Sequence, residues 1–171
     1  MRMTMVLFVI ASFFSTAFAD APLRPPSIIE VWSANKKYVA VLEYKETKIS
    51  VFSVQQKGER KKLWEMAGWF RWTHLSNDGK YLDIPYWGAN LLTLDYNRDE
   101  IMLRIVKRGK TTTVLKLSDL IRDFSKLQRT VSHYHWGNYV GFNEKNEFVI
   151  ETVEGNLFLV SPVDGKLKES K

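Results

Sequence analysis

Three segments of the chain repeat one pattern, in which a short polar turn leads through an aromatic residue into an apolar strand. The segments are 33–41, 76–84 and 143–151. The spacing from Ser33 to Ser76 falls inside the roughly 40–45-residue period of four-stranded propeller blades. Repetition at this period is typical of β-meanders, so the chain is predicted to be mainly β, built of antiparallel, propeller-blade-like β-meander repeats.

Apolar and polar residues alternate along runs that predict the strands of these units. The expected strands are 27–33, 38–44, 48–54 and 62–66 in the first unit, 69–75, 81–87, 91–96 and 101–106 in the second, 111–117 as a further strand, and 139–142, 148–153 and 156–160 in the third. A closed propeller needs about four or more blades. We therefore expect an open or sandwich-like sheet arrangement in a single β-rich domain over 27–171.

Turn residues and one helix complete the expected fold. Residues 77–79 are Asn-Asp-Gly, whose glycine is expected to adopt the left-handed conformation of a tight hairpin, and Asn35 and Asn146 stand in the equivalent turns. Apolar residues recur at helical spacing over 118–127, behind Ser118 as an N-cap. We expect one short amphipathic helix there, covering one face or end of a sheet.

The N-terminal segment 1–19 has the features of a bacterial signal peptide. Arg2 precedes an apolar run over 5–14, and the small residues Ala17 and Ala19 fit a cleavage site. The run is too short to cross a bilayer, which needs about 20 residues. We expect cleavage after Ala19, an extended proline-rich leader over 20–26, and a periplasmic or secreted protein. An uncleaved anchor or a buried helix is the alternative.

Composition narrows the range of partners. The chain contains no cysteine, so an exported form has no disulfides and depends on a hydrophobic core. Its net charge of +6 favours anionic neighbours. Nucleic acid has the matching charge, but export argues against it. We expect no nucleic-acid partner and, after signal cleavage, no segment that spans a membrane.

The second repeat carries a resemblance to known proteins. Residues 76–82 read Ser-Asn-Asp-Gly-Lys-Tyr-Leu, which resembles the repeat of WD40-like propellers of the periplasmic translocation-protein type. Together with 64–69 and 131–136, the pattern is similar to that of small exported bacterial proteins with such repeats, over most of 27–165. The resemblance implies β-meanders and brings no catalytic residues with it. The first repeat has Asn-Lys, and the third Lys-Asn, where Asp-Gly is expected.

Motifs for nucleotide or acyl chemistry are absent from the sequence. Residues 107–111 superficially resemble a phosphate-binding loop, but Arg104 stands where that loop requires glycine. The chain has no Gly-x-Ser-x-Gly motif and no cysteine nucleophile. We therefore expect no catalytic residue and no cofactor.

His133 and His135 form the one suggestive pair of titratable residues. Alternate residues of a strand share a face, so two imidazoles there could begin a metal site. A third ligand would have to come from His74, Asp78 or Asp83. The neighbouring aromatic residues favour packing instead, so we expect no metal and keep His133 and His135 as candidate binding residues.

Aromatic residues suggest where a ligand approaches. The chain has six tryptophans, most of which are expected in the core. Pro85 cannot donate to a strand ladder, which marks its strand as an edge or a bulge. Tyr86, Trp87 and Asn90 follow it, and we expect this edge to bind a ligand, with Trp87 exposed. Basic runs near the ends of two hairpins could contact an anionic partner.

Three classes of function are compatible with these features. The leading hypothesis is a non-catalytic binding or protein-interaction module of the cell envelope, with an envelope protein or a glycan as its partner. The second is a metal-dependent or hydrolytic enzyme centred on His133 and His135. The third is an accessory or inhibitor-like protein that acts by adding a strand to a partner's sheet.

Overall fold

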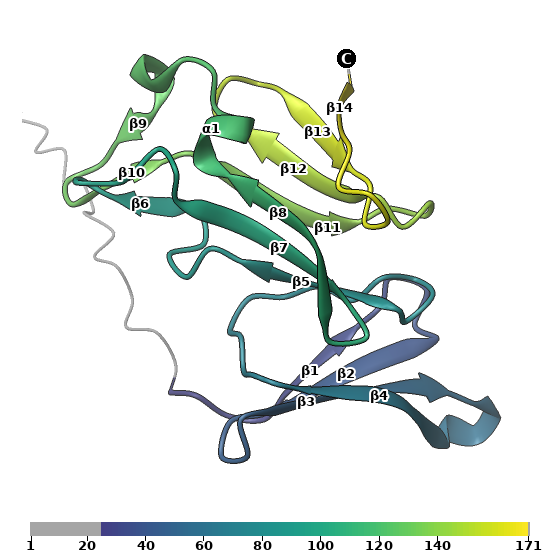
Figure 1. Cartoon of the computed structure of the whole chain (residues 1–171). Helices are drawn as coiled ribbons and strands as arrows, with labels where there is room; N and C mark the ends of the chain where they lie inside the picture. Colours follow the sequence, from purple (N-terminus) through teal and green to yellow (C-terminus); the bar gives the residue numbers. More distant parts are fainter. Residues whose placement is uncertain (1–24, 171) are drawn as a thin grey trace, which may run out of the picture.

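The computed structural model describes residues 25–170, which fold mainly into antiparallel β-sheets (Figure 1). The predicted signal peptide and residues 20–24 of the predicted leader lie outside this range. Three meander sheets follow one another along the chain, and a small additional sheet lies beside them. The predicted fold class, mainly β with propeller-blade-like meanders in an open arrangement, is confirmed.

The first sheet is a four-stranded meander in the order β1-β2-β3-β4. Its strands are β1 (Ile29–Trp32), β2 (Tyr38–Glu43), β3 (Lys48–Val54) and β4 (Arg60–Ala67). A short 3-10 turn, η1 (Gln56–Gly58), lies between the last two strands. All four predicted strands are present, because their alternating apolar residues have a core on one side to face.

The second sheet has the order β5-β7-β8, with strands β5 (Tyr81–Pro85), β7 (Ile101–Lys107) and β8 (Lys110–Lys116). The predicted strand 69–75 is wrong except at its end, where Leu75 forms an isolated bridge to Leu82. The predicted strand 91–96 is shorter, and it leaves this sheet. As β6 (Leu91–Thr93) it pairs with β10 (His133–His135), which also pairs with β9 (Gln128–Arg129).

The third sheet is also a complete four-stranded meander, with the order β11-β12-β13-β14. Its strands are β11 (Gly137–Phe142), β12 (Phe148–Thr152), β13 (Leu157–Val160) and β14 (Leu167–Ser170). The sequence did not predict β14, because half of its residues are charged and it presents no apolar alternation. Backbone pairing with β13 holds it in place.

The predicted helix over 118–127 is wrong in extent and in its cap. The structure has α1 (Leu117–Leu120) with Lys116, not Ser118, as N-cap, followed by the 3-10 turn η2 (Phe124–Lys126). The Glu154 carboxylate accepts hydrogen bonds from the backbone N–H groups of residues 122 and 123, which therefore do not continue the helix. Within residues 25–170, no helix has the length and apolar character to cross a membrane.

Two hydrophobic cores join the three meander sheets. Residues of the first sheet, such as Leu42 and Val51, pack with Leu82 and Val106 of the second. On its other face, the second sheet packs with the third around the fully buried Trp136. The second sheet thus lies between the other two (Figure 1), and successive residues of β5 face different cores because strand side chains alternate.

The three repeated turns lie side by side and are joined by asparagine hydrogen bonds. The side-chain amide of Asn35 donates to the backbone oxygen of Asn77 at 2.7 Å, and the Asn77 amide donates to that of Asn143 at 3.1 Å. The N–H of Asn35 donates to Asn77 Oδ1, and that of Asn77 to Asn146 Oδ1, at 3.0 and 2.7 Å. The sequence repeat is therefore also a spatial repeat, which sets neighbouring sheets in register.

Candidate functional site

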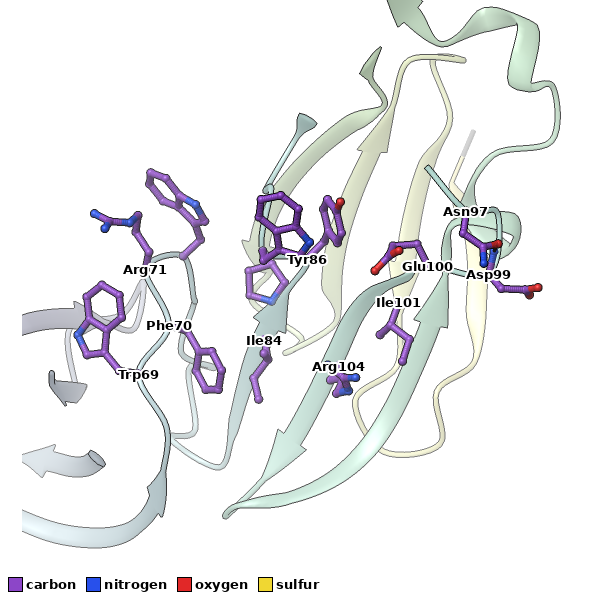
Figure 2. A pocket seen from close by; sticks show the side chains of 13 residues that line it. Trp69, Phe70, Arg71, Ile84, Tyr86, Asn97, Asp99, Glu100, Ile101 and Arg104 are labelled. Carbon is purple, nitrogen blue, oxygen red and sulfur yellow. Dashed lines mark hydrogen bonds between the residues drawn. The ribbon is translucent and has the colours of Figure 1, made fainter. Parts of the chain in front are cut away.

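A cavity of about 570 Å³ opens beside the end of β5 (Figure 2). We call it the aromatic cleft. Its walls come from the segment after β4, the turn after β5 and the start of β7. The lining residues on which its chemistry depends are Trp69, Trp72, Tyr86, Trp87, Glu100 and Arg104.

The turn after Pro85 places Trp87 at this cleft. The Tyr86 N–H donates to the Met102 oxygen at 2.8 Å, which extends the pairing of β5 with β7 by one residue. The chain then turns sharply, and a Cβ at Gly88 would lie 2.4 Å from the Leu91 oxygen, so only glycine fits there. As a result Tyr86 is buried while Trp87 is 73% exposed, as predicted for Trp87.

Further aromatic surface comes from the segment that joins the first two sheets. The Trp69 indole N–H donates to the Ser27 oxygen at 3.0 Å, and its ring packs edge-on against Tyr44. The Arg71 guanidinium lies 5.5 Å from the Trp69 ring centre. Trp72 is 43% exposed at the same cleft. The cleft therefore combines exposed indole faces with charged side chains.

The expectation that most tryptophans are core residues is wrong. Only Trp64 and Trp136 are buried, while Trp72 and Trp87 are exposed and the remaining two are half-buried. The exposed pair gathers at one cavity and is not scattered over the surface. Contiguous exposed aromatic surface of this kind is typical of binding sites.

A second cavity of about 260 Å³ adjoins the aromatic cleft and shares Arg71 and Trp72 with it. We call it the histidine pocket. It is also lined by His74, Asn90 and Asn138, among others. These residues come from the start of the second sheet, the turn before β6 and the first strand of the third sheet.

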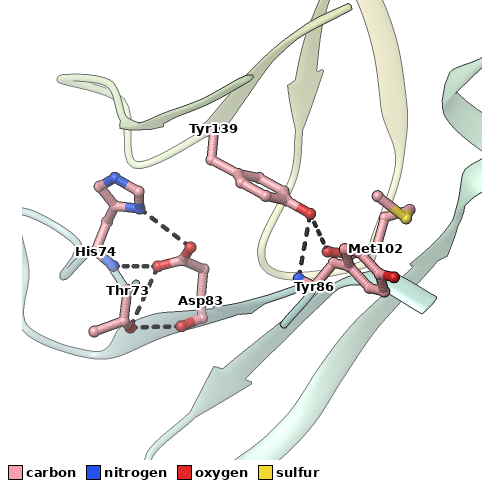
Figure 3. A network of polar contacts seen from close by, with 6 residues as sticks. All are labelled: Thr73, His74, Asp83, Tyr86, Met102 and Tyr139. Carbon is pink, nitrogen blue, oxygen red and sulfur yellow. Dashed lines mark hydrogen bonds and ion pairs between the residues drawn. The ribbon is translucent and has the colours of Figure 1, made fainter. Parts of the chain in front are cut away.

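His74 is held in the histidine pocket by a buried carboxylate (Figure 3). Asp83 is fully buried, and its Oδ2 lies 3.1 Å from His74 Nδ1. Its Oδ1 accepts the backbone N–H of His74, and the Thr73 hydroxyl donates to its backbone oxygen at 2.5 Å. These contacts fix the orientation of the imidazole and make Nδ1 the protonated nitrogen, because a carboxylate oxygen accepts the bond.

Two opposing effects act on the pKa of His74. Burial lowers this pKa. The hydrogen bond to Asp83 and the negative charge of its carboxylate raise the pKa, and together they outweigh burial, so the net shift is upward. The Phe148 ring packs edge-on against the imidazole, and a Cβ at Gly141 would lie 3.0 Å from His74 Cδ2. The third sheet therefore contacts the ring through both β11 and β12.

The contact between His74 and Asp83 leads us to expect that stability depends on pH. A raised folded-state pKa stabilises the protein below the unfolded pKa of His74, and this contribution is lost as the pH rises through the folded value. In Asp83→Asn, only burial remains and lowers the pKa, so stability should instead increase with pH between about 5.5 and 8. Urea unfolding of the wild type and of Asp83→Asn across this range tests the reversal. Equal slopes in the two proteins would contradict the pairing.

Tyr139 ties the third sheet to the end of β5. Its hydroxyl donates to the Met102 oxygen and accepts the Tyr86 N–H at 3.2 Å (Figure 3). Burial strongly raises the pKa of Tyr139, so that the hydroxyl stays neutral. Although Tyr139 lines the histidine pocket, its proton is committed to a backbone oxygen, and its role is to position the turn that carries Trp87.

The structure brings together some of the predicted site residues and separates others. Tyr86 and Trp87 line the aromatic cleft, and Asn90 lines the adjoining pocket. His133 and His135 lie on β10 and line neither cavity; His133 Nδ1 is 2.8 Å from the Ser132 hydroxyl, and His135 Nδ1 is buried without a partner. The sequence did not single out Trp69 or Trp72, which lie in a segment predicted as a strand.

The proposed third metal ligands do not join the β10 histidines. His74 is paired with Asp83, and Asp78 accepts hydrogen bonds from its own turn. Across residues 25–170, no three His, Asp or Glu side chains are grouped so that they could hold a metal ion. The described part of the chain thus does not place a metal site at His133 and His135.

Comparisons with known proteins yield likenesses among solved structures. No protein-family model matches the chain, and no curated protein matches it. Among solved structures, a periplasmic gluconolactonase from Pseudomonas aeruginosa is similar, with a TM-score of 0.37 and 14% sequence identity. The likeness covers 84% of this chain and 38% of that chain, so the chain spans well under half of that protein's length.

Proposed function

We propose that this protein is a binding module of the bacterial cell envelope that recognises a carbohydrate through the aromatic cleft. The observation that carries the proposal is the presence of two exposed tryptophans, Trp72 and Trp87, in one cavity of about 570 Å³. Indole faces stack on the C–H surfaces of sugar rings, while flexible aliphatic side chains do so poorly. Such a cleft holds a glycan without any chemical step.

Polar side chains beside the indoles suit the hydroxyl groups of a sugar. Arg104 and Glu100 line the same cleft, together with Asn97 and Asp99. These groups supply both donors and acceptors, and their charges are mixed in sign. The ligand is therefore expected to be a neutral or weakly charged glycan, bound with little dependence on salt concentration.

The other two binding modes are less well supported. An anionic partner would suit the basic surface where Lys80, Lys107, Arg108 and Lys110 line a separate cavity of about 430 Å³, which contains no aromatic residue. Strand addition at β5 is disfavoured, because its outer edge is already engaged: Leu75 bridges Leu82, and the Asp83 N–H donates to the His74 oxygen at 3.3 Å.

Trp87→Ala is expected to weaken glycan binding about tenfold or more, since exposed aromatic anchors dominate binding energy when a ligand covers them. The ligand is first selected on an array of bacterial surface polysaccharides, and the affinity is then measured by titration calorimetry. Trp32→Ala is the matched control: Trp32 is half-buried on the first sheet beneath Arg60 and does not line the cleft, so its loss should leave the affinity unchanged.

A salt series separates the cleft from the basic surface. The wild type should keep its affinity within about twofold between 50 and 500 mM salt, because Debye screening weakens exposed charge pairs but not stacking. If Lys107→Ala with Arg108→Ala abolishes binding while Trp87→Ala binds fully, the aromatic cleft is not the site.

A further inference from the structure

We propose that the histidine pocket hydrolyses a carboxylic ester, with His74 as the general base that activates a water molecule and Asp83 as its positioning residue. The proposal rests on the proposed function in one respect: the adjoining aromatic cleft would hold the sugar that carries the ester. The substrate class is therefore an O-acylated carbohydrate.

The geometry of the pair is that of a base held by an orienting group. Asp83 is fully buried and lies 3.1 Å from His74 Nδ1, so the ring presents Nε2 as its acceptor. Within residues 25–170, Nε2 makes no hydrogen bond, and it is not among the buried polar atoms that lack a partner. A base with a free nitrogen at a cavity and a fixed tautomer is the arrangement that general-base catalysis requires.

Two amide side chains lie at the same pocket. Asn90 and Asn138 both line it, and neither side-chain amide forms a hydrogen bond within the described part of the chain. An unengaged amide N–H is a donor for the negative charge that develops on a carbonyl oxygen during attack. The pocket thus combines a base with two candidate oxyanion donors from separate elements, the turn before β6 and the strand β11.

The lining of the pocket favours ester hydrolysis over other reactions of sugars. Hydrolysis of a glycosidic bond commonly needs two carboxyl groups that face the bond. Among the described residues no carboxylate lines this pocket, and that of Asp83 is buried behind His74. An amide carbonyl is less reactive than an ester carbonyl and an amine is a poorer leaving group than an alcohol, so water activated by a single histidine suits an ester better than an amide. Among the described residues no serine lines the pocket, and the hydroxyl of Thr73, which does line it, donates to the Asp83 backbone oxygen, so the nucleophile is water itself.

The reaction balances without a further reagent. The water oxygen forms a bond to the ester carbonyl carbon while one water proton passes to His74 Nε2. The tetrahedral oxyanion accepts hydrogen bonds from the amides of Asn90 and Asn138. The bond between that carbon and the alcohol oxygen then breaks, and the proton on Nε2 passes to the departing oxygen. The products are a carboxylic acid and the free sugar hydroxyl, and no atom changes oxidation state.

Hydrolysis of 4-nitrophenyl acetate and of O-acetylated xylan by the full protein tests the proposal. His74→Gln should lower kcat/KM by about 100-fold or more on both esters, the size typical for loss of a general base. His133→Gln, a histidine on β10 outside both cavities, is the matched control and should retain the wild-type rate. Circular dichroism and thermal unfolding establish that each variant is folded.

The pH profile distinguishes a base from a structural residue. The wild-type rate should rise with pH and level off at the pH where nuclear magnetic resonance shows the His74 ring losing its proton. The charged or titratable groups around this ring are Asp83 on β5, Arg71 before it and Tyr139 on β11. In Asp83→Asn the same inflection should move to lower pH, because the carboxylate no longer supports the imidazolium.

Two results would overturn the ester proposal: a wild-type rate no higher than that of folded His74→Gln, or a rate without an inflection at the His74 titration. Because 4-nitrophenyl acetate is too small to need the cleft, this test does not depend on glycan binding. Failure of the proposed function would instead appear as full glycan binding by Trp87→Ala. The two hypotheses therefore fail separately.

Discussion

Replacing Trp136 with alanine should lower the free energy of unfolding by about 3–5 kcal/mol, the typical cost of truncating a buried tryptophan. Trp136 has no exposed surface and lies in the core between the second and third sheets. Its indole N–H donates to the Ala89 oxygen at 2.8 Å, and its ring packs edge-on against Tyr139. The variant loses both this packing and the hydrogen bond, and it leaves the Ala89 oxygen without its partner.

Urea denaturation followed by circular dichroism measures the loss. Trp136→Phe should recover part of the stability, because it restores ring packing but not the N–H donor. Val131→Ala is the control: Val131 is 98% exposed, and its truncation should change stability by less than about 0.5 kcal/mol. A Trp136→Ala midpoint equal to that of the wild type would show that the second and third sheets do not share this core.

Trp136 also connects the core to the candidate site. Its backbone N–H donates to the Asn90 oxygen, and its backbone oxygen accepts the N–H of Val153 in the turn after β12. The turn that carries Trp87 and Asn90 is therefore anchored through Trp136 to the third sheet. The position of the candidate binding residues thus depends on a residue that is itself fully buried.

Local patterns explain why much of the fold was predictable. Strands of the first sheet follow the alternation of apolar and polar residues, since one face of that sheet meets a core. The repeated turns also form where turn-favouring residues predicted them, although in the first turn the residue with positive φ is Lys36 and not Asn35. What failed was set by distant contacts: Glu154 ends the helix early, and β13 supplies the pairing that makes β14 a strand.

The candidate site was predictable only where one short segment carries it. Pro85 and the turn after it pointed to Tyr86, Trp87 and Asn90, which do lie at two adjoining cavities. The His74–Asp83 pair was not predicted as a pair, because it depends on register. Leu75 must bridge Leu82 for the His74 and Asp83 side chains to meet. The predicted strand over 69–75 did not specify which residues of the next strand it would pair with.

Gly79→Ala should destabilise the fold by about 2–5 kcal/mol, and Gly79→Val by at least as much. The residue has a φ of 67°, where a side chain costs about 1–2 kcal/mol. A Cβ there would also lie 2.4 Å from Tyr38 Cδ1, and the Gly79 oxygen is held by the Trp64 indole N–H at 2.7 Å. The backbone cannot move away from the Tyr38 ring without losing that hydrogen bond, so overpacking adds about 1–3 kcal/mol.

Gly155→Ala separates the two costs. Gly155 has a φ of 81° but no atom within 4 Å of an added Cβ, so this variant should lose only the backbone contribution of about 1–2 kcal/mol. In a Tyr38→Ala background the ring is gone, and the additional cost of Gly79→Ala should fall to the Gly155→Ala value. Denaturant unfolding of the four proteins in this cycle gives the coupling directly. If the two substitutions are simply additive, Gly79 does not approach Tyr38, and the second repeat does not pack on the first in the way that the asparagine-linked turns require.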